Sequence, residues 1–202
     1  MSMNGPVYLR RYGEPAWNRK EMLRYAGVHG KAPDLDPLLD ACLDEVREKL
    51  VYQVCYREFP VISAGDQLDL GFTKSASVAL KRNLAGCDHM VLFAATVGIE
   101  LDRLIARYAA VSPTKALLLQ AIGAERIESL CEEFSREIQS EKEAEGYRVR
   151  PRFSSGYGDF PLETQREIFA VLDCPRKIGV TLNESLLMSP SKSVTAIIGV
   201  GK

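Results

Sequence analysis

The longest regular pattern in the chain runs from Ser112 to Gly146 and predicts one long helix. Ser112 followed by Pro113 is a typical helix start, because serine can cap the first turn and proline has no N–H there that needs a partner. The second half of the segment is rich in charged residues, which indicates a solvated end. Apolar residues recur at helical spacing through the segment: Leu117, Ala121, Ala124, Ile127, Leu130, Cys131, Phe134 and Ile138.

Three other segments are predicted to be strands, and we expect the long helix to pack on the sheet that they form. Residues 51–62 are rich in β-branched and aromatic side chains, and residues 89–95 and 194–200 are short apolar runs. These features are typical of buried strands. Strands and helices do not alternate regularly, which favours an α+β fold. We therefore expect a single domain over residues 1–202 with a mainly antiparallel twisted sheet flanked by helices, and an irregular segment over residues 1–17.

Shorter elements fill the intervals between these segments. Helix caps and helical spacing predict further helices, and a turn at Gly65-Asp66 predicts a return strand over residues 67–72. The segment 179–188 is expected to be a strand or a tight turn. The expected helices cover residues 18–26, 36–50, 78–84, 99–108 and 162–172, the last of them ended by Cys174-Pro175.

Composition excludes several classes of function. Of 202 residues, 26 are basic and 27 acidic, so no basic surplus points to nucleic acid or to an anionic membrane as an obligatory partner. No apolar run is long enough to span a bilayer, and the first residues lack the pattern of a signal peptide, so we expect a cytoplasmic protein. Five scattered cysteines and two distant histidines have no metal-ligand spacing, and we expect no metal site.

The segment from Arg152 to Pro161 (RFSSGYGDFP) carries the densest chemistry in the chain. Arginine matches a carboxylate bidentately, and tyrosine can stack on a flat ring. Glycines let another molecule approach the backbone closely. A glycine turn with a structural arginine is an equally open interpretation. A second polar loop covers residues 184–193.

Several common catalytic motifs are absent. The chain has no G-x-G-x-x-G after a strand and no G-x-S-x-G, and neither histidine lies in a recognisable nucleophile constellation. The residues alone therefore favour a binder of a small zwitterion over a hydrolase. The two polar loops would supply its polar groups.

At these loops the sequence resembles the activation domain of cobalamin-dependent methionine synthase, in its short stand-alone form. Three matched segments occur in the family's order: RFSSGYGDFP at 152–161, KIGVTLNES at 177–185 and MSPSKSV at 188–194. The first of these alone is a weak pattern, whereas the three together are fairly specific. Weaker similarity extends back to residue 94.

The resemblance implies a domain that binds S-adenosylmethionine and presents its methyl group to a corrinoid inactivated as Co(II). One electron from a flavodoxin-like or ferredoxin-like donor, together with the methyl group, would restore methylcobalamin. By resemblance Arg152 binds the methionyl carboxylate, Gly156 and Tyr157 shape the nucleoside pocket, and Glu133 supplies an acidic contact. The loop with Pro190, Ser191, Lys192 and Ser193 would face the corrin. No corrinoid-binding module accompanies these segments, so the corrinoid is expected on a partner, such as a split methionine synthase.

Two functions from different classes remain open. The first is an S-adenosylmethionine-binding accessory subunit for reductive methylation of a corrinoid protein. The second is a non-catalytic partner of a corrinoid protein that keeps the fold and has lost the ligand. An unrelated methyltransferase is disfavoured because the glycine-rich strand-turn-helix is absent.

Overall fold

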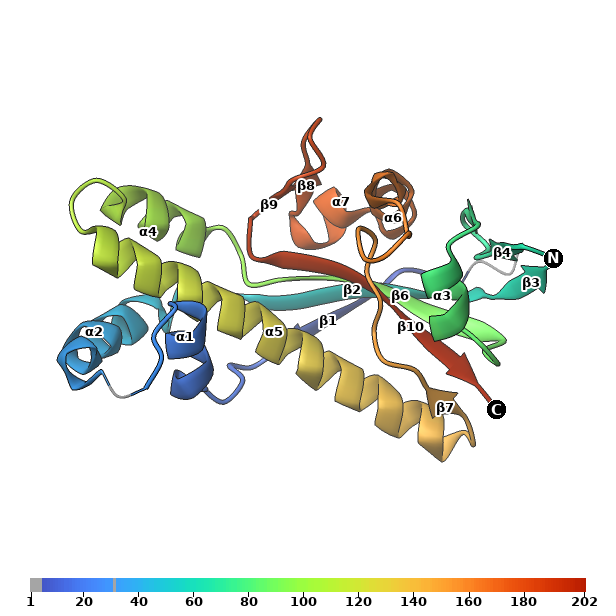
Figure 1. Cartoon of the computed structure of the whole chain (residues 1–202), viewed down its shortest axis with the longest axis horizontal. Coiled ribbons are helices and arrows are strands. Elements are labelled where there is room, and N and C mark those ends of the chain that lie inside the picture. The colour runs from blue at the N-terminus through green and yellow to red at the C-terminus, as the bar shows by residue number, and fades with distance from the viewer. Residues whose placement is uncertain (1–4, 31) are drawn as a thin grey trace.

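The structure, a computed structural model, describes residues 5–30 and 32–202. Within these residues the main sheet has five strands in the order β1-β2-β6-β10-β7, and each neighbouring pair is antiparallel. The predicted α+β fold with a mainly antiparallel sheet is confirmed, and the three predicted strands lie side by side in this sheet (Figure 1). The strands are β1 (Tyr8–Tyr12), β2 (Tyr52–Pro60), β6 (His89–Thr96), β10 (Ser193–Gly201) and β7 (Arg148–Val149).

Two smaller sheets lie outside the main one. One has three strands, and the return strand predicted over residues 67–72 appears there as β4. The other is a two-stranded hairpin, which agrees with the strand or tight turn expected over residues 179–188. Their strands are β3 (Ile62–Ala64), β4 (Gln67–Asp69) and β5 (Lys74–Ser75), then β8 (Thr181–Leu182) and β9 (Met188–Ser189).

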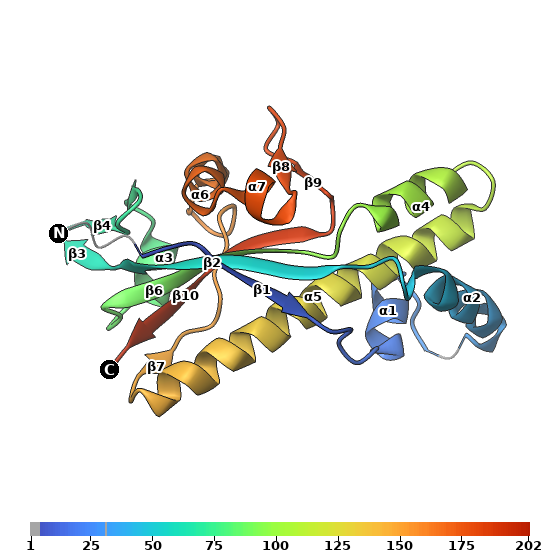
Figure 2. The same ribbon diagram turned by 180° about the vertical axis from the view of Figure 1, so that it is seen from behind.

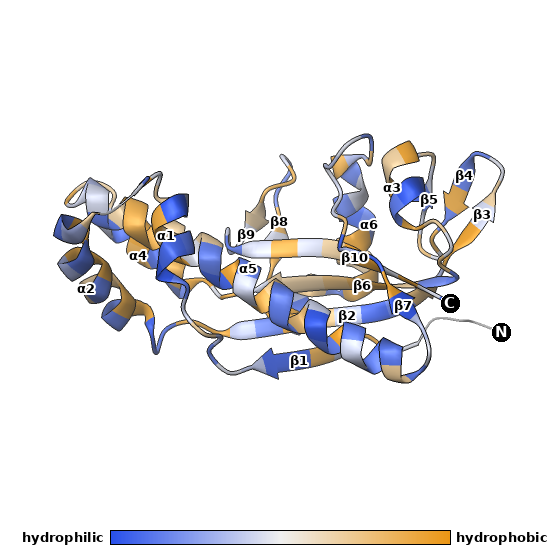
Figure 3. Ribbon diagram, turned by 60° about the horizontal axis from the view of Figure 1, so that its bottom comes forward, coloured by the Kyte–Doolittle hydropathy of each residue, from blue (hydrophilic) through white to orange (hydrophobic). Residues whose placement is uncertain are grey.

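Helices cover both faces of the main sheet. The long helix α5 crosses one face, and α1, α2 and α4 pack against α5 near one end of the sheet, whereas α3, α6 and α7 cover the other face (Figures 1 and 3). No helix of the described residues is long and apolar enough to cross a membrane. The helices are α1 (Arg19–Tyr25), α2 (Asp36–Val46), α3 (Val78–Asn83), α4 (Glu100–Tyr108), α5 (Pro113–Ala144), α6 (Gln165–Leu172) and α7 (Cys174–Ile178), with short 3-10 turns η1 (Pro33–Leu35) and η2 (Leu162–Thr164).

Strand β6 explains why residues 89–95 are apolar without alternation. Successive side chains of a strand point to opposite faces. Val91 and Phe93 enter the core under α5, whereas Met90 and Leu92 enter the core under α6 and α7. Both faces of β6 are therefore buried, which explains why all its residues from Met90 to Ala95 are apolar.

Two expectations from the sequence are wrong. Residues 8–12 are not irregular but form edge strand β1, which pairs with β2 in the view from behind (Figure 2). Because β1 lies at the edge of the sheet and pairs with β2 alone, its side chains can be polar. Arg10, for example, donates to the hydroxyl of Tyr56 at 2.8 Å. The pair Cys174-Pro175 begins α7 rather than ending α6. Asp173, in a left-handed conformation with φ of 52°, ends α6, and the proline then occupies the first turn of α7.

The N-terminal segment is held on α5 by a buried ion pair. Arg126 is fully buried and donates to the carboxylate of Glu125 at 2.6 Å. It also donates to the carbonyl oxygens of Pro15 at 2.6 Å and of Ala16 at 2.8 Å. Trp17 lies against the guanidinium, 4.3 Å from the ring centroid. Each charge therefore has close partners, as a buried ion pair requires.

Helix α5 carries a glycine where two other side chains cross it. A Cβ added at Gly123 would lie 2.2 Å from Cδ2 of Leu101 on α4 and 2.9 Å from Cγ of Lys192. Contacts this short cannot exist, so α4 and the loop before β10 require glycine at this position.

We expect Gly123→Ala to destabilise the protein by about 1–3 kcal/mol, the usual cost of overpacking a core. The gain in helix propensity, about 1 kcal/mol, offsets part of that cost. Urea unfolding measures the difference. The control is Gly13→Ala, because a Cβ at Gly13 meets nothing within 4 Å. Equal stability of the Gly123→Ala variant and the wild type would contradict the packing.

A carboxylate from the segment 152–161 caps α3. Asp159 accepts from the hydroxyl of Ser77 at 2.5 Å, from the N–H of Val78 at 2.7 Å and from the N–H of Ala79 at 3.0 Å. These hydrogen bonds, the one from Ser77 first, lower the pKa of Asp159 to about 2. The segment is thereby fixed to α3.

This cap makes stability depend on pH. Because the pKa of Asp159 is lower in the folded state, its contribution is present above the unfolded pKa. That contribution is lost as pH falls through roughly 4 to 2. We expect Asp159→Asn to flatten the loss of unfolding free energy over this range, measured by urea titrations at several pH values. The exposed Asp66→Asn variant is the control, and an unchanged pH profile for Asp159→Asn would refute the linkage.

Candidate functional site

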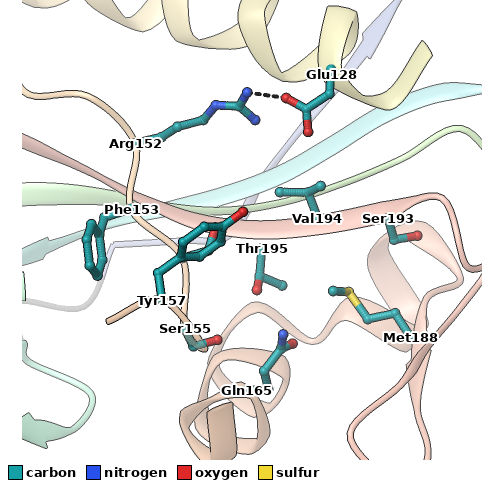
Figure 4. Close-up of a pocket in the computed structure, with 11 residues that line it drawn as sticks. Glu128, Arg152, Phe153, Ser155, Tyr157, Gln165, Met188, Ser193, Val194 and Thr195 are labelled. Carbon is teal, nitrogen blue, oxygen red and sulfur yellow. Dashed lines mark hydrogen bonds and ion pairs between the residues drawn. The ribbon is translucent and has the colours of Figure 1, made fainter. Parts of the chain in front are cut away.

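A cavity of about 420 Å³ lies where the segment 152–157 passes the beginning of β10 (Figure 4). Its walls come from α5, from this segment, from α6, from β9 and from β10. The volume is within the range usual for small-molecule sites. The lining residues are Glu128, Arg152, Phe153, Ser154, Ser155, Tyr157, Gln165, Met188, Ser193, Val194 and Thr195.

The cavity lies at an open edge of the main sheet. Strand β7 pairs only with the end of β10, at Val200 and Gly201, and Phe153 makes one further bridge to Ile197. Ile197 donates its N–H to Phe153 and accepts the N–H of Phe153, both at 2.8 Å. Backbone groups two residues apart point to the same edge of a strand, so Thr195 directs its N–H and C=O toward the cavity. No strand of the described residues pairs with this edge between residues 193 and 195.

Arg152 and Glu128 form an ion pair on one wall of the cavity. Their side chains are 27% and 38% exposed, so both remain accessible to a ligand. Burial lowers the pKa of Arg152, but the hydrogen bond to Glu128 and the interactions with nearby ionisable groups together outweigh burial, so the pKa of the guanidinium is raised. The wall thus presents a permanent positive charge beside a carboxylate.

Three buried oxygens in the same cavity have no hydrogen-bond partner among the described residues. They are Oγ of Ser155, Oε1 of Gln165 and Oγ1 of Thr195. The three residues are 6%, 5% and 2% exposed, respectively. Most buried polar groups in proteins are paired. Three unpaired oxygens on residues that line one cavity leave hydrogen-bonding capacity there for a polar ligand or for water.

Aromatic rings form the outer part of the cavity. Tyr157 is 67% exposed, and its ring centroid lies 6.5 Å from that of Phe153. Gly156 holds the turn between them with φ of 89°, a conformation that favours glycine. Its N–H donates to the carbonyl of Phe160 at 2.8 Å. An exposed tyrosine face beside a polar cavity suits a flat heterocycle.

The loop 188–193 forms the opposite wall. Met188 and Ser193 line the cavity, and the peptide bond between Ser189 and Pro190 is cis. The hydroxyl of Ser193 donates to Oγ1 of Thr96 or to the carbonyl of Pro190, each 2.9 Å away.

The middle of this loop contacts helices rather than the cavity. Ser191 donates its N–H and its hydroxyl to the carboxylate of Asp102 on α4. Lys192 extends over Gly123 of α5. Burial lowers the pKa of Lys192, and Asp102 opposes that effect. The loop is therefore anchored to the α4–α5 pair.

The structure brings together only some of the residues expected at the site. Arg152, Tyr157 and Ser193 line the cavity, and Gly156 lies within its turn. Pro190, Ser191 and Lys192 belong to the wall-forming loop but do not line the cavity. Their contact with a corrin stays a prediction.

Glu133 lies away from Arg152. It lines a second cavity with Trp17 and Arg136, between α5 and the N-terminal segment. Residues five apart on a helix lie about 140° apart around its axis, so Glu133 and Glu128 cannot share one face. The acid beside Arg152 is Glu128.

Glu128, Gln165 and Thr195 line the cavity without having been expected there, whereas Ser155 lies in the segment 152–161 that was expected to supply polar groups. For strand β10, the sequence does contain a pattern that indicates a polar face. Ser193 and Thr195 are polar residues at alternate positions at the start of an otherwise apolar segment. Such alternation predicts one polar face. Gln165 has no comparable signal, because its burial depends on how α6 packs.

The described residues bring no three histidine, cysteine or acidic side chains together in a metal-binding arrangement. The groups that could act on a ligand are thus the ion pair, the three oxygens, the aromatic rings and the open edge of β10.

Comparison with known proteins identifies the family and the fold of this chain. The family model described as "Vitamin B12 dependent methionine synthase, activation domain" matches residues 76–201. A solved structure described as the MetH reactivation domain bound to AdoHcy aligns with a TM-score of 0.70 and 18% sequence identity. The alignment covers 96% of this chain and 78% of that one. No curated protein gives a significant match.

The similarity in structure establishes the shared fold, and the family match covers more than half of the chain, including both cavity-lining loops. This chain belongs to the family of activation domains of vitamin B12-dependent methionine synthase.

Proposed function

We propose that this protein binds S-adenosylmethionine in the cavity at Arg152 and presents its methyl group to a Co(II) corrinoid carried by a partner. The partner would be a corrinoid-binding protein or the other modules of a methionine synthase. Family membership supports this role in reactivation. The AdoHcy in the similar MetH structure supports it too, because AdoHcy is what remains of S-adenosylmethionine after methyl transfer.

The observation that carries the proposal is the ion pair beside three unpaired oxygens. The methionyl part of S-adenosylmethionine is a zwitterion with one carboxylate and one ammonium group. Arg152 can bind the carboxylate through two N–H groups, and Glu128 can bind the ammonium. The amino-acid end of the ligand, when it enters between them, replaces one ion pair by two, while the sulfonium group adds one positive charge to the site.

The nucleoside part matches the rest of the cavity. Adenine has a flat face that can stack on Tyr157, and its amino group is a hydrogen-bond donor. Ser155, Gln165 and Thr195 line the cavity, and rotation of their side chains would bring their unpaired oxygens to the ribose hydroxyls. The backbone edge of Thr195 offers one further donor and one further acceptor. The residues present therefore fit the ligand.

The chemistry requires an open site. In the proposed reaction the bond from the sulfonium sulfur to its methyl group breaks and a bond from cobalt to carbon forms. One electron, from a flavodoxin-like or ferredoxin-like donor, balances the step from Co(II), and S-adenosylhomocysteine leaves. The protein's own task is to hold and orient the methyl donor toward the partner, which an accessible cavity at a sheet edge permits.

The competing hypothesis is a corrinoid-protein partner that keeps the fold without binding S-adenosylmethionine. It differs from the proposal in one measurable respect, the affinity for the ligand. The unpaired oxygens favour the proposal, because a cavity that had lost its ligand would gain stability by pairing or replacing them.

We expect isothermal titration to detect S-adenosylmethionine binding that Arg152→Ala weakens by about 1.5–3 kcal/mol, the usual value of a hydrogen bond to a charged group. Glu128→Gln should weaken binding in the same direction, since it removes the partner of the ammonium. Arg176→Ala is the matched control, because Arg176 is largely exposed and pairs only with Asp173. If wild-type protein gives no heat at millimolar ligand, the non-catalytic hypothesis replaces the proposal.

A second experiment tests the reaction. A Co(II) corrinoid protein, a one-electron reductant and S-adenosylmethionine are mixed with this protein, and methylcobalamin is followed by its absorbance. We expect remethylation that depends on all components, and a lower rate with Arg152→Ala at limiting ligand. Binding without remethylation by any corrinoid partner tested would leave a ligand-binding protein with a different role.

A further inference from the structure

We infer that Asp102 is a positioning residue: its carboxylate fixes the loop 188–193, and thereby sets the cavity wall made by Met188 and Ser193. The ligand part of this inference rests on the proposed function. The anchoring part rests on contacts alone. Asp102 lies on α4, outside the three segments that carry the family resemblance.

Ser191 donates two hydrogen bonds, one to each carboxylate oxygen of Asp102. The N–H of Ser191 lies 2.7 Å from Oδ2 of Asp102, and the hydroxyl of Ser191 lies 2.5 Å from Oδ1. Hydrogen bonds to an ionised acceptor are about twice as strong as neutral ones. Two such bonds restrict both the position and the orientation of the loop.

Neighbouring contacts extend the anchor on either side. The carbonyl of Lys192 accepts the N–H of Val97 at 3.2 Å, and the Lys192 stem lies over Gly123. Ser193, the next residue, lines the cavity and is bound to Thr96. Asp102 thus holds the loop two residues from a wall that a ligand would touch.

The position of this wall decides how much room the cavity has. Met188 and Ser193 lie at one side of the cavity, beside Thr195 of the same strand as Ser193, and Phe153 and Tyr157 lie at the other side (Figure 4). Side chains that bind a ligand act effectively only when their supporting contacts hold them within fractions of an ångström. Release of the loop would therefore weaken ligand binding without any change in Arg152 or Glu128.

The test compares Asp102→Ala with Asp102→Asn. Asparagine can accept the Ser191 N–H through Oδ1 and donate to the Ser191 hydroxyl, so it should retain most of the anchor. Alanine can do neither. Glu100→Ala is the matched control, because it removes an acid from the same turn of α4 whose one ion-pair partner among the described residues is Arg103.

Hydrogen–deuterium exchange of the peptide that contains residues 188–194 reports the anchor directly. We expect Asp102→Ala to exchange about tenfold faster there, Asp102→Asn to exchange near the wild-type rate, and Glu100→Ala to have no effect. The dissociation constant for S-adenosylmethionine should rise about tenfold in Asp102→Ala only. In a double-mutant cycle, Ser191→Ala should weaken binding in the wild type and have little effect in Asp102→Ala.

Each outcome decides the inference. Unchanged exchange in Asp102→Ala overturns it, as does an equal effect of Glu100→Ala. Faster exchange with an unchanged dissociation constant also overturns it, because the loop would then be anchored without shaping the site. If the wild type itself does not bind S-adenosylmethionine, the proposed function fails, and the exchange rates alone decide whether Asp102 fixes the loop.

Discussion

The pairing of β10 with the segment that precedes α6 stops at Ile197, and the cavity exists because it stops there. Beyond that bridge the chain leaves the sheet edge through Ser154 and Ser155 and turns at Gly156. The first residues of β10 keep a free edge, and both faces of the strand become accessible to one ligand. Val194 and Thr195, which point to opposite faces, therefore line the same cavity.

The two cavity-lining loops are each fixed by an aspartate to a helix outside the cavity. Asp159 ties the segment 152–161 to α3, and Asp102 ties the loop 188–193 to α4. The sheet cannot supply this rigidity, because its hydrogen bonds end where the site begins. Charge-assisted hydrogen bonds to helices fix these two loops, whereas strand pairing fixes the rest of the main sheet.

The sequence predicted the elements whose pattern is local. The helix from Pro113, the two-sided burial of β6 and the final strand all follow from periodicity and β-branched content. The position of Arg152 at the site followed from its neighbours in the chain. Glu128 could not be assigned in the same way, because the rotation of α5 relative to the segment 152–157 depends on packing along its full length. Edge strand β1 was missed because its pairing relies on the backbone and leaves little pattern in the side chains.

The place of β10 in the sheet also constrains how the protein can fold. Strand β10 lies between β6 and β7, yet every other element of the described chain precedes it in sequence. During synthesis the edge of the largely apolar strand β6 that pairs with β10 therefore stays unpaired until about residue 201 has left the ribosome. Pairing at such large sequence separation is intrinsically slow. A nascent chain of this kind exposes an aggregation-prone strand edge during the whole interval between the synthesis of β6 and that of β10.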